Sequence, residues 1–175
     1  LITTNLGKGS SLVKFRPWPL IWNNHTMFTK ASITCVIPAR LNSTRLTEKV
    51  LRPLGGISLL ERVWHAANNV PFFSRVIIAV DDPRTAAAVE AFGGTYVNTS
   101  VDCINGTHRL IEVMRQQTEP TDIWVNWQAD EPFIKAPMIA DLLSVATVTA
   151  APQVWTLCTP LTDSTKLHDP NTVKV

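Results

Sequence analysis

The sequence predicts an α/β fold in which a mostly parallel sheet carries helices on both faces. From residue 32 onward, short β-branched runs alternate with amphipathic helical segments, as in folds built from strand–helix–strand units. The first run, Ile33 to Ile37, is continuously apolar and ends at Pro38, which indicates a central strand buried on both faces. Hydrophobic residues make up 45% of the 175 residues and charged residues 17%, so the chain can bury a substantial core.

The expected strands are short apolar runs that follow or precede turn residues. They cover residues 33–37, 75–80, 95–98, 123–127 and 154–158. The expected helices have apolar residues at helical spacing, proline in the first turn, or glycine beyond the last turn. They cover residues 58–67, 83–92, 106–117 and 137–148, while Gly55-Gly56 is expected to form a plain turn. A further strand is expected to begin at Thr172 and is cut short at Val175.

The net charge of +2 comes from the first thirty residues. Residues 1–30 hold four bases and no acid, leaving 12 bases against 14 acids, a net charge of −2, in the remainder. No basic stripe with interleaved aromatic residues is left to follow a nucleic acid backbone. Residues 1–30 show no sustained periodicity, so we expect a poorly structured leader, non-native before Met27, ahead of a domain at 31–175.

Cysteine usage and hydropathy restrict the compartment. Cys35, Cys103 and Cys158 are an odd number at long spacings, which matches neither a disulfide framework nor a paired metal motif. No apolar run reaches the roughly 18 residues that a membrane-spanning helix needs. We therefore expect a cytoplasmic protein without membrane or nucleic acid partners.

The segments after the strands are the places to look for ligands, because open α/β sheets bind them beyond the carboxyl ends of the strands. The loop after the first strand contains Arg40, Ser43, Arg45 and Lys49. Cations and hydroxyls of this kind suit a polyphosphate, since guanidinium forks bind phosphate bidentately and lysine binds it as a point charge. The alternative is an ordinary solvated loop.

A tight turn, Asn105-Gly106-Thr107, leads directly into the third expected helix. The exposed backbone donors of a helix start can bind a base edge or an anion. The alternative interpretation is that Asn105 is a helix N-cap. His108 is either a ligand or general base, or simply a solvated side chain in the first helical turn.

The segment after the fourth strand, Asn126 to Pro132, carries two adjacent carboxylates. A carboxylate at the end of a central strand suits Mg²⁺ bound together with a nucleotide phosphate. Adjacent residues on extended chain point to opposite sides, so one of the two reaches the metal, and we choose Asp130 over Glu131. The alternative is that these acids cap the helix expected at residue 137.

Taken in order, the motifs resemble those of the 3-deoxy-manno-octulosonate (KDO) cytidylyltransferases, also called CMP-KDO synthetases. The matching pieces are VIPARLNSTRL (36–46), RVIIAVDD (75–82), AVEAFGG (88–94), NGTHRL (105–110), VNWQADEP (125–132) and DPNTVKV (169–175). The resemblance implies the nucleotide-diphospho-sugar transferase type of fold, which is Rossmann-like and also called GT-A. It also implies a reaction of lipopolysaccharide synthesis in which CTP and KDO give CMP-KDO and pyrophosphate with Mg²⁺.

The resemblance further implies roles for individual residues. Four of them would hold the CTP phosphates: Arg40, Ser43, Arg45 and Lys49. Three would face the cytosine, one the sugar and one the metal: Asn105, Gly106, Thr107, Gln128 and Asp130. Arg40, Lys49 and Asp130 are the expected catalytic residues.

The resemblance covers only the amino-terminal part of the family pattern. Family members continue past residue 175 into a region that supplies most KDO contacts, a second metal-binding aspartate and a homodimer interface, so we expect this chain to be an incomplete, inactive fragment. Glu48, His108 and Ala129 depart from the family, which has glycine, an acid and glycine there. The alternatives left open are another sugar nucleotidyltransferase and a non-catalytic nucleotide-binding remnant.

Overall fold

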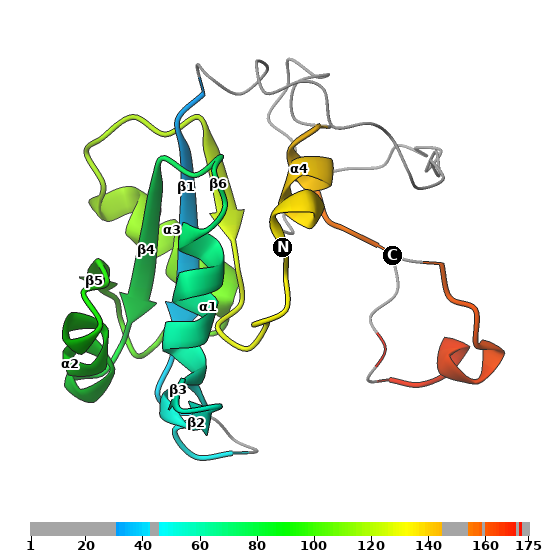
Figure 1. Cartoon of the computed structure of the whole chain (residues 1–175), viewed down its shortest axis with the longest axis horizontal. Helices are drawn as coiled ribbons and strands as arrows, with labels where there is room; N and C mark the ends of the chain where they lie inside the picture. The colour runs from blue at the N-terminus through cyan, green and yellow to red at the C-terminus, as the bar shows by residue number, and fades with distance from the viewer. Residues whose placement is uncertain (1–30, 43–45, 145–153, 159, 171, 173–175) are drawn as a thin grey trace.

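A four-stranded parallel sheet forms the centre of the protein (Figure 1). The structure is a computed structural model and describes residues 31–42, 46–144, 154–158, 160–170 and 172. The strands lie in the order β5–β4–β1–β6. Their bounds are Ile33–Ala39 for β1, Arg75–Val80 for β4, Tyr96–Asn98 for β5 and Ile123–Asn126 for β6. The predicted parallel sheet, with the first strand inside it, is confirmed.

Strand β1 continues through Pro38 to Ala39, two residues past the predicted end. The carbonyl of Val36 accepts from Trp127 N at 2.9 Å, so Val36 bonds toward β6. Pro38, two residues further on, presents its nitrogen on the same side, beyond the last paired residues Val36 and Asn126. Because no ladder hydrogen bond is needed there, the missing N–H of proline is tolerated.

The helices follow the predicted ranges closely. Their bounds are Leu59–Asn68 for α1, Pro83–Ala91 for α2, Gly106–Gln116 for α3 and Ala136–Ser144 for α4. Ser58 caps α1 by accepting from Glu61 N, and Asp82 caps α2 by accepting from Arg84 N. None of the described helices is long and apolar enough to cross a membrane.

The helices cover both faces of the sheet, as predicted. Successive β1 side chains point to opposite sides of the sheet, so the clusters they join show which helices lie on which face. Ile33, Cys35 and Ile37 belong to the cluster that contains the buried residues of α1, α2 and α4. Val36 belongs to a smaller cluster on the other face, where α3 contributes Leu110 and Val113.

A short antiparallel hairpin precedes α1. Strands β2 (Pro53–Leu54) and β3 (Ile57–Ser58) pair around Gly55 and Gly56, whose φ angles are 64° and 91°. Two consecutive positive φ angles are typical of the tight hairpin turn that glycine adopts without steric cost. The Gly55-Gly56 turn was predicted, but the two-residue strands beside it were not.

The predicted strand at 154–158 is wrong. These five residues have no strand conformation, and Val154 and Leu157 are 36% and 37% exposed. A strand requires a partner for its backbone groups, and within the described residues no strand pairs with the outer edge of β6. Short 3-10 turns, η1 and η2, occupy Lys49–Leu51 and Ser164–Leu167. The predicted leader at 1–30, helix residues 145–148 and final strand fall outside the described residues, apart from Thr172.

Candidate active site

The candidate site lies at the carboxyl edge of the sheet, the lower edge in Figure 1. Because β1, β4, β5 and β6 are parallel, the segments that follow them all emerge at this edge. Three of those segments hold the predicted ligand residues. They are residues 40–52 after β1, residues 99–105 between β5 and α3, and residues 127–135 after β6.

An ion pair joins the first and third of these segments. Lys49 Nζ lies 2.6 Å from Asp130 Oδ2, and the two side chains are 38% and 48% exposed. The turn η1 positions Lys49, with the neighbouring Val50 buried in the core. A cation and a carboxylate that are 81 residues apart in sequence therefore meet where a nucleotide phosphate and its metal were predicted.

Asp130 does not cap a helix. Helix α4 begins at Ala136, so Asp130 lies too far from its first turn for the capping interpretation. Trp127 instead supports the turn that presents Asp130, because its Nε1 donates to the carbonyl of Glu131 at 3.0 Å and its side chain is buried. Burial raises the pKa of the Glu131 carboxyl, and the neighbouring Asp130 raises it further.

The start of α3, directly after the second segment, lies against the third segment at Gly106. A Cβ atom placed on Gly106 would lie 3.2 Å from the side-chain amide of Gln128 and 3.3 Å from Pro38 Cγ. A side chain here would crowd both neighbours, so glycine allows α3 to begin close to the ends of β1 and β6. Gly106, Thr107 and Gln128 are all half-buried. The structure therefore brings together the two segments predicted to bind the base and the sugar.

Asn105 is the N-cap of α3. Its side-chain oxygen accepts from His108 N at 2.9 Å, so the structural interpretation of this residue is correct. His108 itself is exposed in the first helical turn. Ligand contacts at this turn would fall to the backbone groups and to Thr107, because the Asn105 oxygen is already engaged.

The remaining predicted phosphate ligands lie in the loop after β1. Arg40 is exposed directly beyond the strand. Ser43 and Arg45 fall outside the described residues. Leu41, which follows Arg40, is 1% exposed and anchors this part of the loop to the core.

Glu48 contacts Arg84 at the start of α2. Arg84 Nη1 lies 2.6 Å from Glu48 Oε1. Glu48 has a φ of 54°, in the left-handed region that glycine adopts more readily than other residues. The acid expected to lie beside the phosphate-binding lysine thus has a cationic partner of its own.

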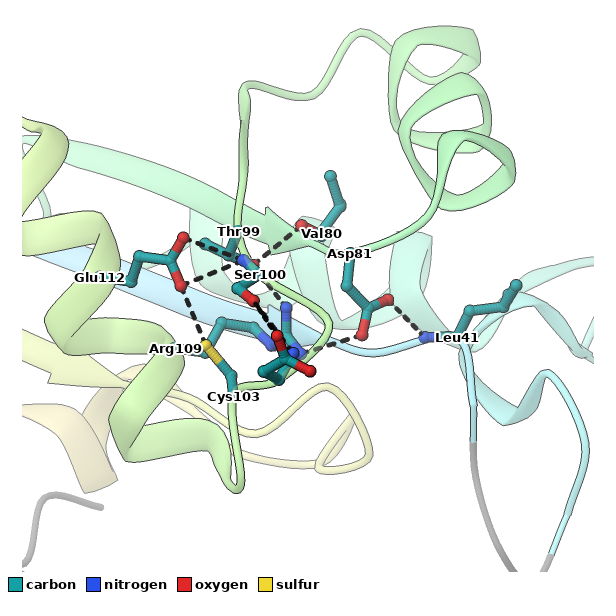
Figure 2. Close-up of polar contacts among 9 residues, drawn as sticks. Leu41, Val80, Asp81, Thr99, Ser100, Cys103, Arg109 and Glu112 are labelled. Atoms are coloured by element: carbon teal, nitrogen blue, oxygen red, sulfur yellow. Dashed lines mark hydrogen bonds and ion pairs between the residues drawn. The ribbon is translucent and has the colours of Figure 1, made fainter.

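Sequence reasoning missed a buried ion pair, Asp81 with Arg109 (Figure 2). Arg109 Nη2 donates to Asp81 Oδ2 at 2.9 Å, and the side chains are 3% and 9% exposed. Each residue carries one signal in the sequence. Asp81 directly follows a buried strand. Arg109 lies four residues before the buried Val113, so Arg109 and Val113 lie on the same face of α3.

An apolar pocket of about 510 Å³ lies beside Asp130. The hairpin and α1 contribute Leu54 and Leu59, and the chain from Asp130 to Ile134 contributes most of the remaining wall. Phe133 is 79% exposed at this wall. The pocket is therefore an open, mostly apolar hollow beside a carboxylate.

The donor set of this edge fits one divalent cation bound jointly with a ligand. Within the part of the chain that the structure describes, no three histidine, cysteine or acidic residues gather into a metal site. Mg²⁺, however, is usually bound through one or two carboxylates plus substrate phosphates and waters. Asp130 supplies such a carboxylate, and Lys49 beside it suits a phosphate.

A parallel α/β sheet with a cationic loop, a glycine-bearing helix start and an acidic turn at its carboxyl edge defines a nucleotide-binding enzyme fold. The pattern of the cytidylyltransferase family matches residues 34–175. The chain belongs to the cytidylyltransferase family, as the motifs predicted.

The chain is similar to curated proteins with a more specific name. It is 41% identical over 139 residues to a 3-deoxy-manno-octulosonate cytidylyltransferase of Rhodopirellula baltica, an alignment covering 79% of this chain and 55% of the relative. The chain thus spans about half the length of the curated relatives it matches.

Solved structures agree on the fold. A CMP:2-keto-3-deoxy-manno-octonic acid synthetase complexed with CTP superposes with a TM-score of 0.65 at 38% identity, covering 69% of this chain and 49% of that one. A Mycobacterium tuberculosis protein in complex with manganese has a TM-score of 0.50 at 22% identity, covering 68% of this chain and 61% of that one. The second likeness concerns the fold alone.

Proposed function

We propose that this chain is the nucleotide-binding part of a KDO cytidylyltransferase, which converts CTP and KDO into CMP-KDO and pyrophosphate. The observation that carries the proposal is the Lys49–Asp130 pair at the carboxyl edge, in a chain 38% identical to a synthetase solved with CTP. The pair brings together the lysine proposed to bind phosphate and the carboxylate proposed to bind the metal. The name of a relative 41% identical to this chain supports KDO as the acceptor, and lipopolysaccharide synthesis follows as the proposed context.

Each segment of the edge has a proposed role. The loop after β1 binds the triphosphate through Arg40, Ser43, Arg45 and Lys49. The turn before α3 binds cytosine through the backbone of Asn105 and Gly106 and through Thr107, and Gln128 contacts the sugar.

The reaction needs positioning and charge neutralisation more than covalent chemistry. A KDO hydroxyl attacks the α-phosphorus of CTP, forming a new P–O bond and losing its proton to solvent. The bond from that phosphorus to the bridging oxygen of the β-phosphate breaks, and pyrophosphate leaves with the bonding pair. Lys49 and Arg40 stabilise the negative charge that accumulates on the phosphate oxygens.

Asp130 is proposed to hold a divalent cation, Mg²⁺, which would neutralise negative charge on the phosphates of CTP when bound. Lys49, which lies beside Asp130, would neutralise charge on the same phosphates. The ion pair between Lys49 and Asp130 opens when CTP binds, since each side chain then has a new partner.

Assembly and compartment are part of the same proposal. The homodimer interface of the family is proposed to lie in the part of the family pattern beyond this chain. A cytoplasmic location is supported by the free thiols of Cys35, Cys103 and Cys158, which suit a reducing compartment.

Two measurements test the proposal. The chain is titrated with CTP, UTP, ATP and GTP with and without Mg²⁺, and pyrophosphate release with KDO is compared with that of a version extended to the length of the relatives. We expect Mg²⁺-dependent binding of CTP in preference to the other nucleotides, and turnover only in the extended version. Equal binding of UTP would favour another sugar nucleotidyltransferase, and binding without turnover in both versions would favour a non-catalytic remnant.

A further inference from the structure

Asp81 connects two parts of the candidate site through its two carboxylate oxygens (Figure 2). Oδ1 accepts from the backbone N–H of Leu41 at 2.9 Å, and Oδ2 accepts from Arg109 Nη2 at 2.9 Å. Leu41 belongs to the loop after β1, and Arg109 belongs to α3. One side chain at the end of β4 therefore spans from the proposed phosphate-binding loop to the helix that begins with the proposed base-binding turn.

Arg109 is held from its other side as well. Its Nη1 donates to Thr99 Oγ1, and Thr99 Oγ1 donates to the carbonyl of Val80 at 2.9 Å. The backbone of Thr99 donates to the same carbonyl at 2.8 Å. The guanidinium is thus bonded to the ends of both β4 and β5, and little freedom remains for it.

Both residues of the pair lie directly behind groups proposed to touch CTP. Leu41 is buried between the exposed residues Arg40 and Asn42, so its N–H determines where Arg40 emerges. Arg109 N donates to the carbonyl of Asn105 at 3.2 Å, so the guanidinium and the turn at 105–107 belong to one helical turn. The side chains of Arg109 and Asp81 are only 3% and 9% exposed, and both oxygens of Asp81 are already engaged by protein donors.

We infer that Asp81 and Arg109 are positioning residues that set the spacing between the phosphate-binding loop and the base-binding turn. The inference rests on the proposed function, because it assumes that those segments bind the two ends of one nucleotide. A linked ligand binds more tightly than its separate halves only when both sites are held at the right distance. The pair therefore raises the affinity for intact CTP, while the affinities for cytidine alone and for polyphosphate alone stay nearly unchanged.

The test uses the chain with three ligands: CTP, cytidine, and tripolyphosphate with Mg²⁺. Titration followed by NMR or calorimetry gives the three dissociation constants. The Kd for cytidine is multiplied by the Kd for tripolyphosphate, and the product is divided by the Kd for CTP. The result is the effective concentration of one half of CTP once the other half is bound. A residue that only stabilises the fold would not lower this effective concentration selectively in a folded variant.

Three variants perturb the pair without opening a large cavity. Asp81→Asn has one side-chain oxygen, so it keeps an acceptor for Leu41 N only by placing its amide donor against the guanidinium. Arg109→Lys keeps the charge but supplies one bond instead of two. The double variant, which combines Asp81→Asn with Arg109→Gln, removes both charges, so that no buried charge is left without a partner.

The matched control is Arg75→Gln. Arg75 is also an arginine paired with an acid, Glu119, at 2.7 Å, and it lies at the start of β4, the end of the strand away from the site. We expect the effective concentration to fall at least about tenfold in Asp81→Asn and in the double variant, and less in Arg109→Lys. The dissociation constants for cytidine and for tripolyphosphate should stay within about threefold of wild type, and the control should match wild type throughout.

Each other outcome counts against the inference. An unchanged effective concentration in a folded Asp81→Asn or double variant would overturn it while leaving the proposed function standing. Loss of folding in both variants would also overturn it, because the pair would then serve the stability of the whole domain. Failure of the wild-type chain to bind CTP would overturn the proposed function and this inference together.

Discussion

Replacing Asp130 with asparagine should have little effect on the stability of the domain but a large effect on its affinity for a metal–nucleotide complex. The Lys49–Asp130 pair is short, 2.6 Å, but its side chains are 38% and 48% exposed. Pairs screened by water to this degree contribute between 0 and about 1 kcal/mol to the free energy of unfolding. Asp130→Asn should therefore lower that free energy by no more than about 1 kcal/mol in urea titrations.

The effect on ligand binding should have opposite signs with and without Mg²⁺. Asparagine keeps an oxygen but loses the charge that a hard cation prefers, so the Mg²⁺-dependent gain in CTP affinity should fall at least about tenfold, or 1.4 kcal/mol. Without Mg²⁺, Lys49 no longer has a carboxylate partner and is available to phosphate. Tripolyphosphate should then bind up to about fivefold more tightly than to wild type, which is the equivalent of the lost pair.

Calorimetric titrations of the variant with and without Mg²⁺ measure both effects. Asp141→Asn is a suitable control, because Asp141 is an exposed acid on α4 that the proposed site does not use. A variant with a lowered unfolding midpoint and unchanged Mg²⁺ dependence would refute the metal-binding role. Weaker binding of tripolyphosphate without Mg²⁺ would refute the argument that the carboxylate competes for Lys49.

Three further predictions concern single side chains. Trp127→Phe keeps a buried ring but leaves the carbonyl of Glu131 without its 3.0 Å donor, so urea unfolding should show a loss of about 1–3 kcal/mol; an unchanged midpoint would contradict this. Glu48→Gly removes a left-handed non-glycine conformation, with φ 54°, and loses only the solvent-exposed pair with Arg84. The free energy of unfolding should therefore rise by about 1 kcal/mol, and a lower melting temperature would contradict this. Burial first, and then the hydrogen bond to Glu112, raise the pKa of the Cys103 thiol to about 11 from 9.0. Because the unfolded thiol ionises first, this contribution to stability is present below pH 9 and is lost as the pH rises toward 11. Between pH 9 and pH 11 the unfolding midpoint of Cys103→Ser should therefore fall less than that of wild type. Equal pH dependence of the two midpoints would contradict this prediction.

The parts of the fold that could be predicted were those encoded by local patterns. Strand β4 has the predicted bounds, residues 75–80, because a continuous apolar run between polar residues specifies a buried strand. Helix α1 was predicted from the spacing of Leu59, Leu60, Val63 and Ala67, and the last three are its buried residues. The segment at 154–158 has an equally apolar sequence, but strand conformation depends on a partner that a local pattern cannot supply.

The candidate site divides in the same way. Asp130 and Lys49 could be singled out because charged residues next to a strand end are visible in the sequence, and their contact at 2.6 Å follows from parallel strands ending at one edge. The pair of Asp81 and Arg109 escaped notice because a buried arginine resembles a surface arginine in sequence. Local signals mark Asp81 and Arg109 separately, but only the sheet order β5–β4–β1–β6, which places α3 beside the end of β4, shows that the two residues pair.

The unequal packing of the two sheet faces has a consequence for motion. Among the described residues, the cluster beneath α3 contains five buried residues, Val36, Ile77, Ala79, Leu110 and Val113, whereas the cluster on the opposite face contains eighteen. Elements with little buried apolar surface open locally at lower free energy than the rest of a domain. Helix α3 is therefore the element whose amide hydrogens should exchange before those of β1 and β4. A nucleotide that binds at its first turn would slow that exchange, so occupancy of the site could be measured as protection along a helix whose far end never touches the ligand.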